Sequence, residues 1–457
     1  MALSLDSVMK ARLLSAGTVL LAAFVCGPAA KAQDWYHMEI DKGAADRIRI
    51  AAADFKPQSA DSQAAAEKRI FDATLFADLT GAGIFDMVSK SMQPTATPGT
   101  QQEINIAQWA AAPTSASMVA FGNLNVSGGK LVVNGFLDDA KNSQYPLIFT
   151  KVYTDEASDD SARQLAHRFA DEIIFRLSGG VPGIAESKIY YVRMMGNGVK
   201  ELAEMDYDGA NQHVLTHLGT DAISPRVSPD NTRVAFSALS SRDGFQIKMY
   251  SLLLNRPVAF PSAGGSNISP AWGPGGNQLA FSSSRGGRND IWVSDPQGAM
   301  ARRLTSFGFD ASPTWNPKTG SQIGFISGRT GLPQLYVMDS DGSGVTRMTD
   351  GGYASSPSWS PNGQFLAFAW DRKYGPGAPG GQDIYVMEVA TKRWIQLTHD
   401  IGRCDFPTWS PDGRHIAFAN SPDGREAHTR IMGMLADGTD RKALTGAGAD
   451  MPNWSWK

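Results

Sequence analysis

A proline-anchored phrase recurs six times in the second half of the chain and constrains the fold more than any other feature. It reads Ser-Pro-x-Trp in three copies, which are Ser269–Trp272, Ser312–Trp315 and Ser356–Trp359. Three weaker copies are Ser224–Val227, Phe406–Trp409 and Met451–Trp454. The six prolines lie 45, 43, 44, 50 and 45 residues apart. A fixed period of this length indicates a solenoid, a propeller or another repeat array.

Each repeat unit predicts four short strands joined by turns. In the unit that follows Ile268, apolar segments at Ile268–Trp272, Leu279–Phe281, Ile291–Val293 and Arg303–Thr305 alternate with Gly, Pro and Asp residues typical of turns. Continuous apolar triplets suit strands that are covered on both faces. Four strands in about 40 to 50 residues is the pattern of a propeller blade.

The two ends of the repeat region predict the number of blades. The first unit begins near Lys188 with three strands and no anchor, and the last anchor supplies a single strand. Together they make a sixth blade, in which the strand Pro452–Trp456 pairs with the strand near Ile189 and closes the ring. Closure removes an open sheet edge. We therefore expect an all-β six-bladed β-propeller over residues 181–457.

Residues 48–180 have a different pattern, which predicts a smaller N-terminal α+β domain. Strands are expected over residues 47–55, 118–126, 130–137 and 147–153. Helices are expected over residues 64–77 and 162–177, and we expect Asp159–Ser161 to cap the second. A Gly- and Pro-rich stretch, Lys373–Gly381, accounts for the 50-residue period as a loop insertion.

The first 32 residues resemble a cleaved signal peptide. Lys10 and Arg12 precede the apolar stretch Leu13–Val25, and Ala30–Ala32 fits a cleavage site. The alternative is an uncleaved anchor, although the stretch is short for a membrane span. We expect an exported protein with an N-terminal arm over residues 33–47. Cys404 is the only thiol outside the signal peptide, and a buried small residue is its simplest role.

Charge and motifs favour no enzymatic chemistry. The net charge of −3 gives no basic footprint for nucleic acid. No G-x-S-x-G nucleophile motif occurs. His213 and His217 have metal-ligand spacing only on a helix, whereas here they flank a predicted strand. We expect no cofactor, no metal site and no catalytic residues, and we interpret the repeated tryptophans as packing between blades.

The repeats resemble those of TolB-type propellers, best seen in Pro357–Gly363 and in Pro407–Gly413 followed by Ile416–Phe418. The order of signal peptide, α+β domain, six blades and closing Trp-Ser-Trp is similar to the TolB family, the periplasmic component of the Tol–Pal system. This resemblance implies a non-enzymatic periplasmic protein. It implies that the propeller binds the lipoprotein Pal and that the mature N-terminal arm engages TolA. The system maintains the outer membrane and draws it inward at division. The chain departs from the repeat at Val227, Phe406 and Met451.

The partner surface is expected at one mouth of the central channel, because the innermost strand of each blade begins near its anchor proline. The residues that precede the prolines would ring this mouth. With their neighbours, the predicted Pal-binding residues are Ser224, Ser269, Asp310, Ser312, Ser356, Arg403, Asp405, Phe406, Asp450 and Met451. Such a mixed, acidic ring suits a protein surface with a basic or polar loop. The alternative for each serine is a turn-forming hydroxyl.

The arm is the second predicted partner surface. Exposed aromatic residues on a terminal segment suit docking to a partner such as TolA. The predicted residues are Asp34, Trp35, Tyr36, His37, Met38, Glu39, Ile40 and Asp41. The alternatives are a frayed terminus or an added edge strand.

Two other functions remain open from the sequence. A hydrolase or lyase could use the propeller channel, but it would need converging acidic or histidine side chains at the rim. A glycan-binding module would need exposed aromatic residues there, and Phe406 alone meets that requirement.

Overall fold

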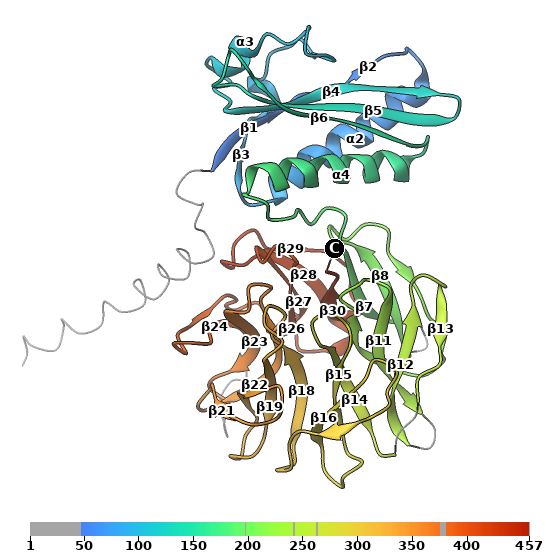
Figure 1. Cartoon of the computed structure of the whole chain (residues 1–457), viewed down its shortest axis with the longest axis vertical. Helices are drawn as coiled ribbons and strands as arrows, with labels where there is room; N and C mark the ends of the chain where they lie inside the picture. Colours follow the sequence, from blue (N-terminus) through green and yellow to red (C-terminus); the bar gives the residue numbers. More distant parts are fainter. Residues whose placement is uncertain (1–46, 197, 241–242, 262–263, 375–380, 457) are drawn as a thin grey trace, which may run out of the picture.

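The computed structural model describes residues 47–456, apart from 197, 241–242, 262–263 and 375–380. The expected signal peptide and all but the last residue of the expected arm lie outside the described residues, as does most of the insertion at Lys373–Gly381. Figure 1 shows two parts, an upper domain of helices and long strands and a lower propeller. In the described residues no helix is both long and apolar enough to cross a membrane.

A mixed sheet forms one layer of the N-terminal domain. Its strand order is β3-β1-β4-β5-β6, and β2 pairs with β4. The pairs of β1 with β3 and β4 are parallel, while β4, β5 and β6 are antiparallel neighbours. The strands are β1 (Ile48–Ala52), β2 (Lys56–Pro57), β3 (Phe85–Met87), β4 (Met118–Ser127), β5 (Lys130–Asp139) and β6 (Leu147–Glu156).

Two long helices, α2 (Ser62–Gly81) and α4 (Asp159–Leu177), cover one face of this sheet. Helix α4 is capped by Ser158, whose side chain accepts a hydrogen bond from the N–H of Ser161, so the predicted cap at Asp159–Ser161 was wrong. Serine at this position satisfies one of the free N–H groups of the first turn, and the two aspartates that follow suit the positive end of the helix dipole. The short elements β2, β3, η1 (Lys90–Met92) and α3 (Ile106–Ala110) were not predicted, because they carry too few residues to show a periodicity.

The described residues of the propeller form six four-stranded antiparallel sheets. Blades 1 to 3 consist of β10 (Ala222–Val227), β11 (Arg233–Ser240), β12 (Gly244–Ser251), β13 (Arg256–Val258); β14 (Asn267–Trp272), β15 (Leu279–Ser283), β16 (Asp290–Ser294), β17 (Arg302–Arg303); and β18 (Asp310–Trp315), β19 (Gln322–Ser327), β20 (Gln334–Asp339), β21 (Thr346–Arg347).

Blades 4 and 5 consist of β22 (Tyr353–Trp359), β23 (Phe365–Asp371), β24 (Asp383–Glu388), β25 (Trp394–Gln396); and β26 (Arg403–Trp409), β27 (His415–Ser421), η2 (Glu426–His428), β28 (Arg430–Leu435), β29 (Lys442–Ala443). Blade 6 joins the chain end β30 (Ala449–Trp454) to β7 (Lys188–Met194), β8 (Lys200–Asp206) and β9 (His213–Val214). Trp454 lies opposite Ile189 in this sheet. The predicted six-bladed propeller and its closure by the last strand are confirmed.

The blades are held together by apolar side chains from neighbouring sheets. Every residue of β15 and β23 is buried, as expected for strands covered on both faces. One hydrophobic cluster joins Ile291 of blade 2 to Phe325 of blade 3, and another joins Phe368 of blade 4 to Leu335 of blade 3. The first strands of adjacent blades contact one another all round the ring and surround the channel.

The N-terminal domain packs against blades 5 and 6, on the face where the innermost strands end. His415, which begins β27 just after the turn from the innermost strand, bonds through Nε2 to the carbonyl oxygen of Gly81 in α2 at 2.7 Å. A buried polar cluster lies beside it. Asp78 of α2 bonds to Nδ1 of His167 at 2.7 Å and accepts from the hydroxyl of Tyr207 at 2.6 Å. This cluster therefore ties both helices to blade 6.

Candidate functional site

The six residues that precede the anchor prolines share an unusual backbone conformation. Their φ angles are all positive, between 50° and 53°, at Ser224, Ser269, Ser312, Ser356, Phe406 and Met451. The pairing of each innermost strand with the next is interrupted at the same place by a bulge. A bulge accommodates the proline, which has no N–H for the ladder. The sequence phrase is therefore the signature of a bulge repeated in every blade.

Positive φ is costly for large side chains, and two blades carry such side chains at this position. The N–H of Phe406 donates to Oδ1 of Asp405 at 2.8 Å, and the N–H of Met451 donates to Oδ1 of Asp450 at 2.8 Å. The four blades that have serine at the bulge have Ile, Ala or Ser in place of this aspartate. Asp405 and Asp450 thus fix the backbone that presents Phe406 and Met451.

These four residues line a hollow of about 290 Å³ at the amino-terminal ends of β26 and β30. Half of the predicted Pal-binding residues of the rim line this hollow, namely Arg403, Asp405, Phe406, Asp450 and Met451. The other lining residues belong to β27 and to the segment that joins β27 to β28. They are Ala419, Ser421, Gly424, Glu426 and Thr429. The sequence reasoning missed this second group because it considered only the innermost strands, and this loop carries no repeated motif.

The hollow combines apolar side chains with acidic ones. Arg403 pairs with Asp405 at 3.1 Å, and Glu426 pairs with Lys200. Burial, together with the negative charge of Asp405, raises the pKa of Asp450 to about 6, although the N–H of Met451 opposes this. Three carboxylates, Asp405, Asp450 and Glu426, therefore line the hollow, and Arg403 and Lys200 pair with two of them.

The other predicted rim residues lie elsewhere on the innermost strands. Ser224 and Ser356 are buried, and the N–H of Ser224 contacts the sulfur of Met451 at 3.3 Å. Ser269 and Ser312 are partly buried. Asp310 is fully buried and pairs with Arg329 at 3.2 Å, so its carboxylate stabilises blade 3 and presents no surface to a partner. The arm residues Asp34 to Asp41 lie outside the described residues.

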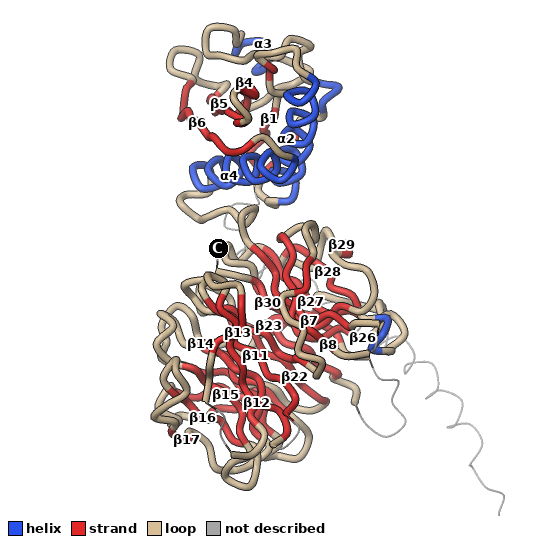
Figure 2. Tube along the Cα trace, turned by 90° about the vertical axis from the view of Figure 1, so that its right-hand side faces the viewer, coloured by secondary structure: helices blue, strands red, loops and turns tan. Residues whose placement is uncertain are grey.

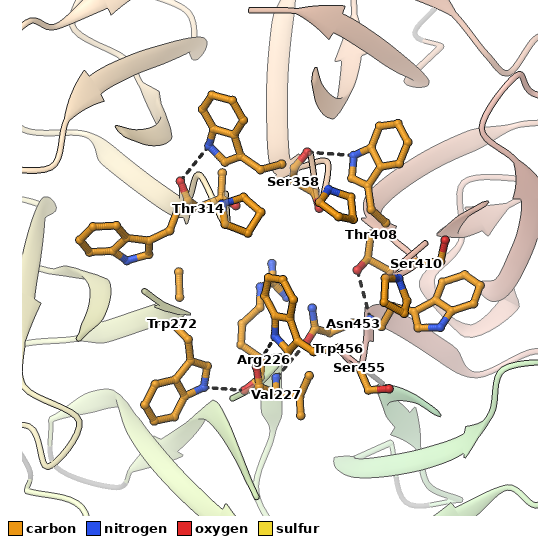
Figure 3. A pocket seen from close by; sticks show the side chains of 18 of the residues that line it. Arg226, Val227, Trp272, Thr314, Ser358, Thr408, Ser410, Asn453, Ser455 and Trp456 are labelled. Carbon is orange, nitrogen blue, oxygen red and sulfur yellow. Dashed lines mark hydrogen bonds between the residues drawn. The ribbon is translucent and has the colours of Figure 1, made fainter. Parts of the chain in front are cut away.

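The opposite mouth, at the carboxyl ends of the innermost strands, is lined by tryptophans (Figure 3). The indole N–H of Trp272 donates to the carbonyl of Arg226 at 3.0 Å, that of Trp359 to Thr314 at 3.2 Å and that of Trp409 to Ser358 at 3.2 Å. Each bond joins one blade to the blade before it. The interpretation of these tryptophans as packing between blades is confirmed.

The arrangement at both mouths suits recognition. Among the described residues, no group of three or more His, Cys, Asp or Glu side chains could hold a metal ion. His213 pairs instead with Glu204 at 2.9 Å on the exposed part of blade 6. Cys404 is buried, and burial raises the pKa of its thiol to about 11, which makes it an unreactive core residue.

Comparison with known proteins agrees with this architecture. A model described as the TolB amino-terminal domain matches residues 36–145, and a model described as the TolB beta propeller domain matches residues 175–374. A crystal structure of TolB from Acinetobacter baumannii superposes with a TM-score of 0.73 at 21% identity, over 90% of this chain and 97% of that one. The likeness to this structure shows the fold of both parts together.

Curated relatives share the sequence over shorter stretches. The chain is 31% identical to the Tol-Pal system protein TolB of Desulfosudis oleivorans over 63% of its length and 64% of the relative. It is 29% identical to the protein of the same name from Gluconobacter oxydans over 63% of its length and 59% of the relative. A TolB homolog of Chlorobium chlorochromatii matches 43% of each chain at 30% identity. The matches thus span less than two thirds of these relatives. Both family models and these relatives agree, and the chain belongs to the TolB family.

Proposed function

We propose that this protein is a non-enzymatic, periplasmic scaffold of a Tol–Pal system, which binds the lipoprotein Pal at the amino-terminal mouth of its propeller. Through that contact it contributes to outer-membrane integrity and to invagination of the envelope at division. Two relatives are named as Tol-Pal system proteins. The N-terminal arm is proposed to engage TolA, and the export signal in residues 1–32 is proposed to deliver the chain to the periplasm.

The observation that carries this proposal is the hollow between blades 5 and 6. Phe406 and Met451 replace the serine found at the same bulge in four other blades, and both line the hollow. Closure of the ring does not require these side chains, because serine serves in the other blades. Apolar groups surrounded by charged ones are typical of the centre of a protein–protein interface. We infer that Pal inserts a segment here, with a basic or polar group facing Asp405 and Asp450.

The test is a double variant, Phe406→Ser with Met451→Ser, assayed for binding to the purified periplasmic domain of Pal. Serine keeps the bulge, so the fold should persist while the apolar contact is lost. We expect the affinity to fall about tenfold or more, since a buried anchor contributes about 2 kcal/mol. The matched control is Met300→Ser, which removes an exposed side chain, also at a residue with positive φ, from the turn between β16 and β17, outside the hollow, and should bind normally. Unchanged binding by the double variant would refute this location.

A separate experiment tests the arm. A variant that lacks residues 33–41 should lose binding to the TolA periplasmic domain while it keeps binding to Pal. Retained TolA binding would reject the arm as the contact. The proposed Pal surface would be unaffected by that result, because the serine variants test it separately.

A further inference from the structure

Among the described residues that line the carboxyl-end part of the propeller channel, Arg226 is the one cation. The residue after each anchor proline is small or neutral in five blades, and these residues are Ala271, Thr314, Ser358, Thr408 and Asn453. In blade 1 it is Arg226, and Figure 3 shows its side chain pointing into the middle of the ring. A charge placed at one of six equivalent positions breaks the symmetry of the channel without serving its repeated contacts.

In the part of the chain that the structure describes, no carboxylate forms an ion pair with Arg226. Its side chain donates one hydrogen bond there, from Nη1 to the carbonyl oxygen of Pro225 at 2.7 Å. Arg226 is partly buried, and this burial lowers its pKa to about 10. A guanidinium offers five N–H donors, and a charge withdrawn from water is costly unless it is paired. The half-buried arginine Arg329 shows the usual solution, since it pairs with Asp310.

The groups around Arg226 do not supply the missing negative charge. The hydroxyl of Thr408 accepts the N–H of Trp454 at 3.1 Å, and Oδ1 of Asn453 accepts the N–H of Val227 at 2.8 Å. Both oxygens are therefore used in joining neighbouring blades. The remaining residues that line this part of the channel are Ala, Pro, Ser, Thr and Trp. The local potential is positive, in contrast to the acidic hollow at the other mouth.

The space next to Arg226 is a small cavity lined by residues of all six blades. It measures about 90 Å³, several times the roughly 10–15 Å³ that a cavity needs to hold one water molecule. An ion of a few heavy atoms therefore fits beside the guanidinium. Trp456 lies near the middle of the ring in Figure 3, beside Arg226, and its indole N–H donates to the carbonyl of Val227 at 3.4 Å. Partial exclusion of water strengthens the attraction between the guanidinium and an anion.

We propose that the propeller channel binds a small oxyanion, of the size of phosphate or acetate, and that Arg226 is its charged ligand. The guanidinium fork bonds to two oxygens of such an ion, which is a strong and geometrically selective contact. This site is independent of the proposed Pal surface, because the two lie at opposite ends of the innermost strands.

The experiment titrates the full chain with inorganic phosphate and, separately, with acetate, at constant ionic strength in sodium chloride, by calorimetry. Wild-type protein should bind one oxyanion, and Arg226→Gln should bind it at least about tenfold more weakly, since it loses a charge-assisted contact. The matched control Arg441→Gln removes an exposed arginine of blade 5 and should bind as wild type. The two arms distinguish a tetrahedral oxyanion from a carboxylate.

Two further measurements keep the proposal falsifiable if Arg226→Gln folds poorly. Arg226→Lys keeps a positive charge and should bind with intermediate affinity. Crystals of wild-type protein soaked in selenate, a tetrahedral oxyanion, should show an anomalous peak beside Arg226. Absence of binding by the wild type, equal binding by Arg226→Gln and wild type, or selenate only at the outer surface would each overturn the proposal.

Discussion

The two mouths of the propeller channel are built from the same six strands, yet they present opposite chemistry. The amino-terminal mouth gathers Asp405, Asp450 and Glu426 around two apolar side chains. The carboxyl-end mouth holds Arg226, which pairs with no carboxylate among the described residues, within a ring of tryptophans. In both places the distinctive residues break the repeat. Comparison of equivalent positions in the six blades therefore shows which side chains the fold requires and which it does not.

The positions of these departures add to the comparison. Phe406, Met451 and Arg226 belong to blades 5, 6 and 1, which are consecutive in the ring. Blades 5 and 6 also carry the N-terminal domain, through His415 and Tyr207. Blades 2 to 4 keep the regular phrase Ser-Pro-x-Trp. One side of the propeller is therefore specialised, while the other side maintains the ring.

The largest expected loss of stability comes from a substitution in β30, the strand that closes the ring. Trp454 is buried, and its indole N–H donates to the hydroxyl of Ser187 at 2.7 Å. Trp454→Ala should lower the free energy of unfolding by about 3 to 5 kcal/mol, measured by urea denaturation. The neighbouring Trp456 is 36% exposed, and Trp456→Ala should cost about 1 kcal/mol or less. Equal effects of the two variants would show that closure contributes little.

The second largest loss of stability is expected from a substitution in the N-terminal domain, which packs on the carboxyl-end face of the propeller. Burial alone would lower the pKa of His167, but the hydrogen bond and the charge of Asp78 outweigh it, so the pKa is raised. The stabilisation is therefore fully present below about pH 6.5 and is lost as the pH rises through the folded-state pKa. His167→Gln should cost about 2 to 4 kcal/mol at pH 6 and less at alkaline pH.

The matched control for this variant is His213→Gln, since His213 forms an exposed pair with Glu204. Exposed pairs contribute about 0 to 1 kcal/mol. Thermal unfolding from pH 5 to pH 9 compares the two variants with wild type. If the cost of His167→Gln is the same across this range, the charge of His167 does not hold the domains together.

A smaller effect is expected at the acidic mouth. The pKa of Asp450 is raised to about 6, so the native state binds a proton that the unfolded state releases from about pH 4 upward. Wild-type stability should therefore fall between about pH 4 and pH 6 and remain at the lower level above that range. Asp450→Asn keeps an oxygen for the N–H of Met451 and removes the charge. It should be more stable than wild type by about 1 to 2 kcal/mol at pH 7, with no advantage below pH 4.

Asp155→Asn is the control for this change, because Oδ1 of Asp155 also accepts the following N–H at 2.8 Å but in the N-terminal domain. Its stability should remain within about 0.5 kcal/mol of wild type at both pH values. A stability of Asp450→Asn that matches wild type at pH 7 would mean that the mouth tolerates its negative charge without cost.

The smallest effect is expected for Phe406→Ser and Met451→Ser. Because four blades place serine in this backbone conformation, Phe406→Ser should change the free energy of unfolding by about 1 kcal/mol or less. Met451→Ser also removes the sulfur that accepts the N–H of Ser224, so its cost should be slightly larger, about 1 kcal/mol. Urea denaturation measures this change. A loss of several kcal/mol would mean that these side chains hold blades 5 and 6 together, and their departure from the repeat would then have a structural cause.

The candidate site could be predicted only in part from the sequence. Arg403, Asp405, Phe406, Asp450 and Met451 were found because they stand next to repeated prolines, whose spacing is visible along the chain. Asp310 lies one residue further from its proline than Asp405 and Asp450 lie from theirs, and it is buried in a pair with Arg329. A side chain on another strand thus decides its exposure. Glu426 and Thr429 were missed because only the folding of the loop between β27 and β28 brings them to the hollow. The sequence also could not show that Arg226 pairs with no described carboxylate, because the groups around a side chain are known only from the three-dimensional structure.

The sequence by itself determined the number of blades and the closing strand, because these depend on a local period of turns, prolines and apolar triplets. Tertiary structure alone decided which rim residues share one hollow, which carboxylates are buried, and where an arginine lacks a counter-charge. Those outcomes depend on distances between strands that are far apart in the chain, and burial and electrostatic interactions act across such distances without leaving a pattern in the order of residues.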